Sequence, residues 1–118
     1  MKETTRARVA AAIGAASLQK DVSAVYDYSA SGYKNISASV SNGSLSGYDY
    51  STSSHFSGGG GSLDFYDYDN SKHVQLKLNG TRFDGYDYDS QKHFSGTING
   101  NSISLYDYET SKYYNYSI

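Results

Sequence analysis

Residues 63–80 read LDFYDYDNSKHVQLKLNG, and this stretch decides the fold. Apolar residues at positions 63 and 65, and again at 74, 76 and 78, alternate with polar residues or tyrosines. Alternation with a period of two and enrichment in aromatic residues are typical of β-strands. Asp69–Lys72 has the composition of a turn, and Asn79-Gly80 is a strong hairpin signal. The stretch therefore predicts two strands joined by a turn, with a second tight turn after them.

The same unit recurs along the chain, marked by the triplet Tyr-Asp-Tyr. Its first tyrosines stand at positions 26, 48, 66, 86 and 106, so the spacings are 22, 18, 20 and 20 residues. A fixed period of this size indicates one supersecondary unit that is repeated. We expect an all-β fold over residues 21–118, an antiparallel meander of about ten strands built from five hairpin repeats of about 20 residues.

The hairpin turns predict a register between the repeats. With Asn79-Gly80 at the centre of a two-residue turn, Leu76 lies opposite Phe83 and His73 lies opposite Tyr86, which are favourable cross-strand pairs. The corresponding pairs, around this turn and those at Asn99-Gly100 and Gly60-Gly61, are Lys72 with Asp87, Val74 with Gly85, Phe94 with Leu105, Gly96 with Ile103, His93 with Tyr106, Lys92 with Asp107, Phe56 with Phe65 and His55 with Tyr66. The first repeat has a longer turn, and its register stays open.

This register separates two faces of the sheet. One face carries the aliphatic and phenylalanine side chains, and we expect it to be buried; it includes Phe65, Leu76, Phe83, Phe94 and Leu105. The opposite face carries the first tyrosine of each triplet, such as Tyr66, Tyr86 and Tyr106, together with His73 and His93. The aspartates fall on the apolar face close to a turn, where we expect a rim of Asp–Lys pairs whose carboxylates also accept turn N–H groups.

A closed up-and-down barrel is favoured over an open sheet or a parallel solenoid. A solenoid with one repeat per coil would stack the five aspartates about 4.8 Å apart, which like charges oppose. The last strand, residues 113–118, contains neither charge nor proline, so an open edge there would invite pairing with another chain. We expect this strand to pair with the strand at residues 22–28 or with a neighbouring subunit.

The first twenty residues differ in composition from the repeats. They are rich in alanine, and Val9, Ile13 and Ala16 form one stripe of a short helix near residues 4–18. We expect residues 1–20 to form a helix that lies over the apolar face or plugs the barrel. The alternative is a weak secretory signal, with Arg6 and Arg8 in its basic part. The lack of a convincing signal favours a cytoplasmic location, and an extracellular one stays open.

Composition and repetition limit the functions that the protein can have. The net charge of −2 argues against nucleic acid as a partner, and no apolar run is long enough to span a membrane. The chain has no cysteine, and histidines two strands apart would lie about 10 Å from each other, too far to share a metal ion. Five similar copies do not make the unequal set of residues that an active site needs. We therefore expect no catalytic residue, no metal and no cofactor.

The tyrosine face is the candidate binding surface, because tyrosine combines a flat apolar ring with a hydroxyl group. We predict a non-enzymatic structural, self-assembly or protein-interaction module, whose partner is another copy or another protein. The alternative is a lectin-like module that binds carbohydrate. The candidate binding residues are Tyr48, Tyr50, His55, Tyr66, Tyr68, His73, Tyr86, Tyr88, His93, Tyr106 and Tyr108.

Overall fold

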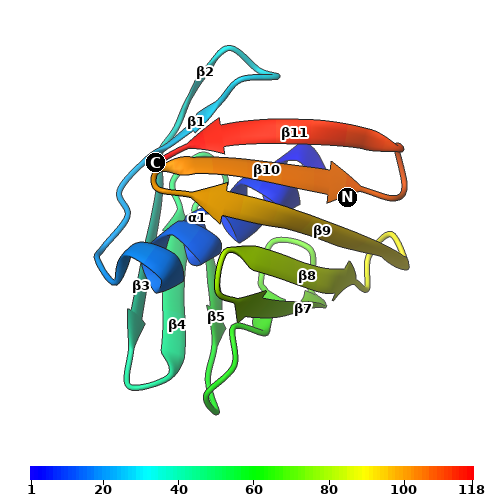
Figure 1. Ribbon diagram of the computed structural model, residues 1–118. Helices are drawn as coiled ribbons and strands as arrows, with labels where there is room; N and C mark the ends of the chain where they lie inside the picture. The colour runs from blue at the N-terminus through cyan, green and yellow to red at the C-terminus, as the bar shows by residue number, and fades with distance from the viewer.

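The computed structural model describes residues 1–118 and consists of one helix and a single eleven-stranded antiparallel sheet (Figure 1). The elements are α1 (Glu3–Leu18), β1 (Val25–Asp27), β2 (Gly32–Lys34), β3 (Ile36–Ser41), β4 (Ser44–Asp49), β5 (Ser54–Gly58), β6 (Phe65–Asp67), β7 (Lys72–Asn79), β8 (Arg82–Asp87), β9 (Lys92–Asn99), β10 (Ser102–Asp107) and β11 (Lys112–Ser117).

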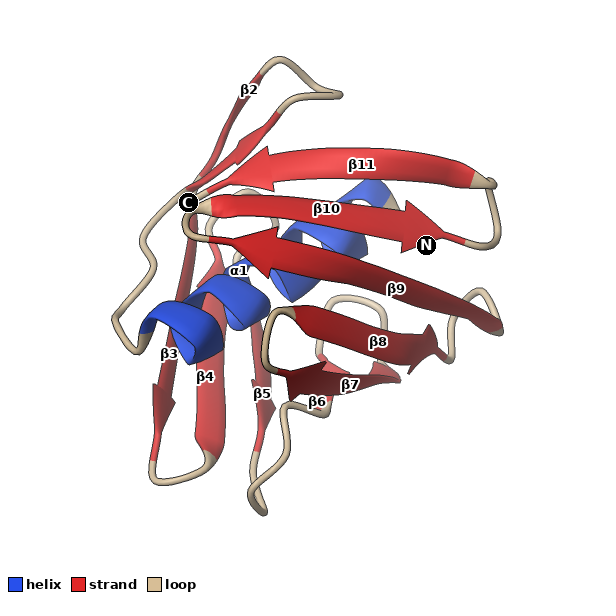
Figure 2. Ribbon diagram, viewed as in Figure 1, coloured by secondary structure: helices blue, strands red, loops and turns tan.

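The sheet curls around α1 into a nearly closed barrel (Figure 2). From β3 to β11 each strand pairs with the next strand in the chain, and β11 then pairs with β1. Tyr26 lies opposite Ser117, and Asp27 lies opposite Tyr116. The predicted barrel and the predicted pairing of the last strand with the strand at 22–28 are thereby confirmed.

A bulge in the first repeat explains why there are eleven strands and not ten. β2 and β3 form one extended stretch interrupted only at Asn35; β2 pairs with β1, and β3 pairs with β4. Val25 lies opposite Lys34, but Val22 bridges Ala38, so the second strand contains one extra residue. A β-bulge of this kind bends a strand. It carries the chain from one end of the strand order to the other, and so brings the barrel close to closure.

The register between the repeats differs from the prediction by two residues. Asn79 pairs with Arg82, so the turn consists of Gly80 and Thr81, and Gly80 has a φ of +60°. Glycine at the first of two turn residues is typical of a type II′ turn. Leu78 therefore lies opposite Phe83. The turn at Gly100 repeats this arrangement.

The slip changes every predicted partner but no predicted face, because side chains alternate with a period of two. His73 lies opposite Tyr66 instead of Tyr86, and Lys72 lies opposite Asp67 instead of Asp87. The other observed pairs are Val74 with Asp87, Leu76 with Gly85, Gly96 with Leu105, Ile98 with Ile103, Phe94 with Asp107, His93 with Tyr86, Lys92 with Asp87, Phe56 with Asp67 and His55 with Tyr48. Phe65, Leu76, Phe83, Phe94 and Leu105 are all buried, as predicted.

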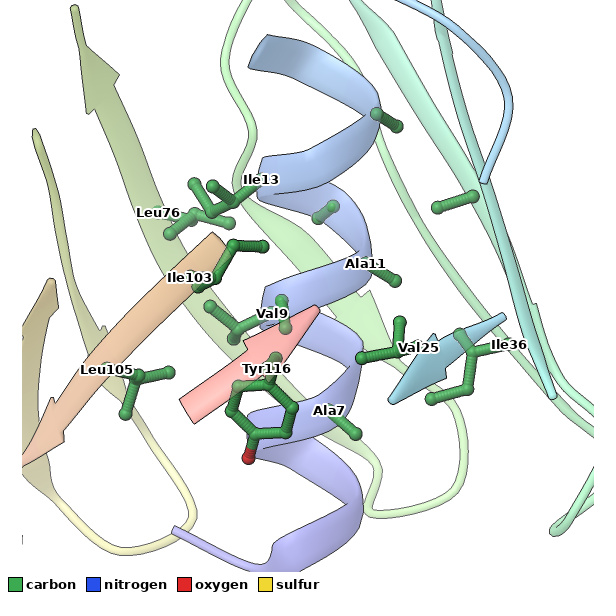
Figure 3. Close-up of a cluster of buried hydrophobic side chains, with 14 of the residues drawn as sticks. Ala7, Val9, Ala11, Ile13, Val25, Ile36, Leu76, Ile103, Leu105 and Tyr116 are labelled. Atoms are coloured by element: carbon green, nitrogen blue, oxygen red, sulfur yellow. The ribbon is translucent and has the colours of Figure 1, made fainter. Parts of the chain in front are cut away.

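The helix fills the barrel. Eleven consecutive residues of α1, from Thr5 to Ala15, are buried, so the helix is enclosed on all sides and not along one stripe only. Val9 and Ile13, the two expected contact residues, are fully buried among strand side chains such as Leu76 and Ile103 (Figure 3). The predicted helix and its role as a plug are confirmed. Alanine suits this position because its small side chain lets the sheet approach the helix closely.

Phenylalanines of the sheet cover glycines on neighbouring strands. Phe83 lies opposite Gly96, and a Cβ at Gly96 would lie only 2.4 Å from the Cζ atom of Phe83. Gly85 with Phe94 and Gly47 with Phe56 repeat the arrangement. The missing side chain makes room for the ring, so these glycines belong to the packing of the core.

Candidate functional site

Each repeat carries three aromatic rings on the outside of the barrel, of which the central one contacts the other two. We call this set an aromatic triad: the first tyrosine of Tyr-Asp-Tyr, the second tyrosine, and an aromatic residue seven positions after the first. The ring centroids lie 4.7–4.9 Å apart in edge-to-face geometry in all five copies. The triads are Tyr26, Tyr28 and Tyr33; Tyr48, Tyr50 and His55; Tyr66, Tyr68 and His73; Tyr86, Tyr88 and His93; and Tyr106, Tyr108 and Tyr113.

Strand geometry assembles each triad. The two tyrosines are two positions apart, so they point to the same side of the chain. The third ring comes from the partner strand of the same hairpin, where it lies directly opposite the first tyrosine, as His93 does with Tyr86. Edge-to-face pairs of this kind stabilise a protein by about 0.5–1.5 kcal/mol beyond the area they bury.

The aspartate between the tyrosines builds the turn that holds the second ring. In every repeat its Oδ1 accepts the backbone N–H of the residue two positions later, as Asp87 does from Asp89 at 3.1 Å. Four positions after the aspartate the backbone is left-handed, with φ between 53° and 59°. The predicted acceptance of turn N–H groups is confirmed. The turn fixes the second tyrosine at the barrel rim, with its ring facing solvent.

All five aspartates are buried. Three of them, Asp49, Asp67 and Asp107, pair with the arginines of α1 or with the terminal amino group, and not with the strand lysines. The guanidinium of Arg8 lies 2.7 Å from a carboxylate oxygen of Asp67 and 2.9 Å from one of Asp49. The guanidinium of Arg6 lies 3.2 Å from a carboxylate oxygen of Asp107. The same carboxylate forms an ion pair with the terminal amino group of Met1.

The predicted pairing with Lys72 and Lys92 is therefore wrong. These lysines stand at the rim of the barrel and are exposed, with no ion pair. Water solvates their ammonium groups there, whereas the carboxylates point inward to the helix. Lys34 is the one strand lysine near such an aspartate, 3.9 Å from Asp27.

Arg8 is held as a buried cation. Burial alone would lower its pKa, but the negative charge of Asp67 and hydrogen bonds to Asp67 and Asp69 outweigh this, and the pKa of Arg8 is raised. Its guanidinium also donates to the hydroxyl of Thr52 at 3.1 Å. Side chains from α1, the β4–β5 turn and the β6–β7 turn thus meet in one ion-paired cluster.

All eleven predicted binding residues belong to the triads, but the prediction omitted part of the set. It left out Tyr26, Tyr28 and Tyr33 of the first repeat and Tyr113 of the fifth. The constant seven-residue spacing from the first tyrosine was the signal that could have found Tyr33 and Tyr113. For Arg6 and Arg8, the signal was a set of aspartates on an apolar face, since buried carboxylates need cations or donors.

A groove runs between the fourth and fifth triads. Tyr86 and His93 line it together with Tyr108 of the next repeat, and its volume is about 650 Å³. Gln91 and Lys92 place polar groups along the same groove. Aromatic walls with a few polar groups at their margin are typical of sites for small ligands.

The fold and the site define a class: a barrel-shaped repeat protein with a helix in its core and five equivalent aromatic triads on its outer surface. No helix of the structure has the length and apolar character needed to cross a bilayer. No protein-family model matches the sequence, and no curated protein or solved structure matches it either.

Proposed function

We propose that the protein is a non-enzymatic interaction module, which binds a protein partner or further copies of itself through its aromatic triads. The observation that carries this proposal is the exposure of the outer tyrosines while their turns are firmly anchored. The exposed fractions are 57% for Tyr28, 76% for Tyr33, 61% for Tyr50, 57% for Tyr68, 44% for Tyr88, 54% for Tyr108 and 68% for Tyr113.

The second tyrosine of each triad leaves roughly half of its surface in water, so much of the ring is available for contacts outside the chain. Its edge-to-face contact with the first tyrosine holds the ring in place. Tyrosine is enriched in binding surfaces because it offers a large rigid contact with little loss of conformational entropy. An ordered turn that presents such a ring supports recognition.

Repetition supports interaction over catalysis. The five triads share one geometry, and their aspartates are engaged by turn N–H groups, serine hydroxyls and the arginines of α1. The turn contacts of these aspartates recur from copy to copy, so they support a structural role for the acid of each repeat. Five equal contacts instead favour multivalent binding, in which several weak contacts act together.

The test is a triple substitution of exposed rings, Tyr68→Ser, Tyr88→Ser and Tyr108→Ser, measured by light scattering over a range of protein concentrations and by binding to candidate protein partners. We expect association to be lost while the far-UV circular dichroism spectrum stays that of the parent; the melting temperature should fall, because each substitution removes an edge-to-face contact worth about 0.5–1.5 kcal/mol. A matched variant with Lys72→Ser, Gln75→Ser and Lys77→Ser changes exposed residues outside the triads and should keep association. Unchanged association in the tyrosine variant would contradict the proposal.

A second candidate function is carbohydrate binding, which the groove between the fourth and fifth triads favours. Sugars stack on aromatic rings and form hydrogen bonds with groups such as the amide of Gln91 and the ammonium of Lys92. A glycan array distinguishes the two functions: a lectin should bind one class of glycan, and Tyr108→Ser with Gln91→Ala should abolish that signal. A purely protein-binding module should give none.

A further inference from the structure

The sheet has a seam at β6, which is much shorter than its counterparts β8 and β10. The β6–β7 ladder contains three residue pairs, whereas β8–β9 and β10–β11 contain six each. The ladder ends where Phe65 lies opposite Val74. The outer edge of β7 beyond this point, residues 75–79, has no strand beside it in the sheet.

The cause lies in the short second repeat. Its four consecutive glycines, 58–61, fold over the turn between β3 and β4, where Gly61 donates its N–H to the carbonyl of Gly43 at 3.1 Å. The chain then follows β5: a Cβ at Gly58 would lie 1.7 Å from the carbonyl oxygen of Asp64. Because residues 61–64 pack towards β5, they leave β7 uncovered on that side.

This edge of β7 offers main-chain hydrogen-bonding groups that no strand pairs. Leu76 points its N–H to this side, where the carboxylate of Asp64 accepts it at 2.8 Å. Main-chain groups of alternate residues point to the same side of an antiparallel strand, so the C=O of Leu76 and the N–H and C=O of Leu78 belong to this edge as well. At Leu76 the side chain of Asp64 thus accepts the hydrogen bond that a neighbouring strand would otherwise accept. The other main-chain groups of this edge have no neighbouring strand to pair with.

A cleft follows the same seam, with a volume of about 340 Å³. Leu63, Leu76, Leu78 and Ala16 of α1 form its apolar lining, and Ser62, Lys77 and Asn79 place polar groups at it. Such a cleft accommodates apolar side chains that point inward from an added strand. Main-chain groups beside an apolar cleft are the two requirements for binding by strand addition.

We propose that this seam binds an extended peptide of a partner protein. The peptide adds a strand along residues 75–79 of β7, on the side where β6 lies and with the same chain direction as β6. Side chains at alternate positions of the peptide enter the cleft above Ala16 and are apolar. The side chains between them face outward beside Lys77, so an acidic or polar residue suits those positions. The site is separate from the aromatic triads and does not depend on the function proposed for them.

The test uses a capped peptide that copies residues 100–104, Gly-Asn-Ser-Ile-Ser, because this segment forms the equivalent part of a full-length repeat. Amide hydrogen exchange is measured with and without the peptide. In the free protein we expect the amide of Leu78 to exchange rapidly, and in the complex to slow by about ten-fold or more. The amides of β9 should not change.

Two controls assign the binding to the seam. A peptide with alternate backbone nitrogens methylated keeps its side chains but loses its donors, and it should bind at least about ten-fold more weakly. Ala16→Phe fills the floor of the cleft and should have the same effect without lowering the melting temperature. Tyr88→Ser, in an aromatic triad, should bind the peptide normally even if it loses the association described above.

Several outcomes would overturn the proposal. Slow exchange of the Leu78 amide in the free protein would mean that the seam is closed. No saturable binding at millimolar peptide, or binding that survives both methylation and Ala16→Phe, would show that the edge is not used. Protection of Leu78 that grows with protein concentration alone would assign the seam to a second copy of the chain.

Discussion

Removing Arg8 should cost a large part of the stability of the fold. The substitution Arg8→Met replaces the arginine by an unbranched side chain that resembles its aliphatic part. It removes the guanidinium and leaves Asp49 and Asp67 without their cation. The side chains of Arg8, Asp49 and Asp67 are at most 2% exposed, so water cannot replace the lost contacts. Breaking a buried ion pair by removing one partner costs about 3–5 kcal/mol. A domain of this size is stable by about 5–15 kcal/mol in total, so the variant should be marginal.

The assay is unfolding in urea followed by far-UV circular dichroism, together with thermal melting. At roughly 3–5 °C per kcal/mol for a domain of this size, we expect the melting temperature to fall by about 10–20 °C. Arg82→Met is the matched control, because Arg82 is exposed and should change stability by less than about 0.5 kcal/mol. A triple variant that adds Asp49→Asn and Asp67→Asn should recover part of the loss, since the uncompensated charges are gone. Equal stability of the two methionine variants would refute the assignment of Arg8 as the buried counter-ion.

Three further predictions concern the core. Burial and the charge of Asp27 raise the pKa of Tyr116. Above about pH 10 the unfolded chain therefore loses a proton that the folded chain keeps, and the free energy of unfolding falls by up to about 1.4 kcal/mol per pH unit. In urea titrations above about pH 10, Tyr116→Phe should lose less stability with rising pH than the parent does. Gly96→Ala should destabilise by at least about 1–3 kcal/mol, because the added methyl meets the carbonyl oxygen of Ser104 and the ring of Phe83, whereas Gly59→Ala, which meets only the hydroxyl of Ser44 at 3.4 Å, should be near neutral by the same assay. Deleting residues 1–20 should expose the apolar interior, with dye binding and aggregation; an unchanged melting curve would contradict the role of α1 as the core.

The faces of the strands could be predicted from the sequence, but their register could not. A two-residue turn can be centred on Asn79-Gly80 as type I′ or on Gly80-Thr81 as type II′, and glycine suits both. The two choices shift the pairing by two residues, which leaves every side chain on the same face. At Asn42-Gly43 both residues have positive φ, as a type I′ turn requires, so the chain uses both alternatives. Alternation of side chains therefore cannot choose between them.

The candidate site was predictable as a surface but not as a set of triads. The ring partner of Tyr86 is set by register, so the prediction joined it to His73 of the preceding repeat when its true partner is His93. The counter-ions were missed for another reason. A helix inside the barrel was predicted, but Arg8 and Asp67 are 59 residues apart, and the pattern of the strands does not say which end of the barrel the arginines of the helix reach.

The aspartate of Tyr-Asp-Tyr connects the core of the protein to its surface, and the repeats show which of its two roles is the general one. Asp87 forms no ion pair, yet its carboxylate accepts the N–H of Asp89 at 3.1 Å and the hydroxyl of Ser90 at 2.9 Å, and its triad has the same geometry as the others. The turn alone is thus sufficient to hold the rings. Ion pairs at Asp49, Asp67 and Asp107 add a second role, because they fix the depth and rotation of α1 inside the barrel. Substituting Asp87 should therefore disturb one triad, whereas substituting Asp67 should disturb a triad and the helix together.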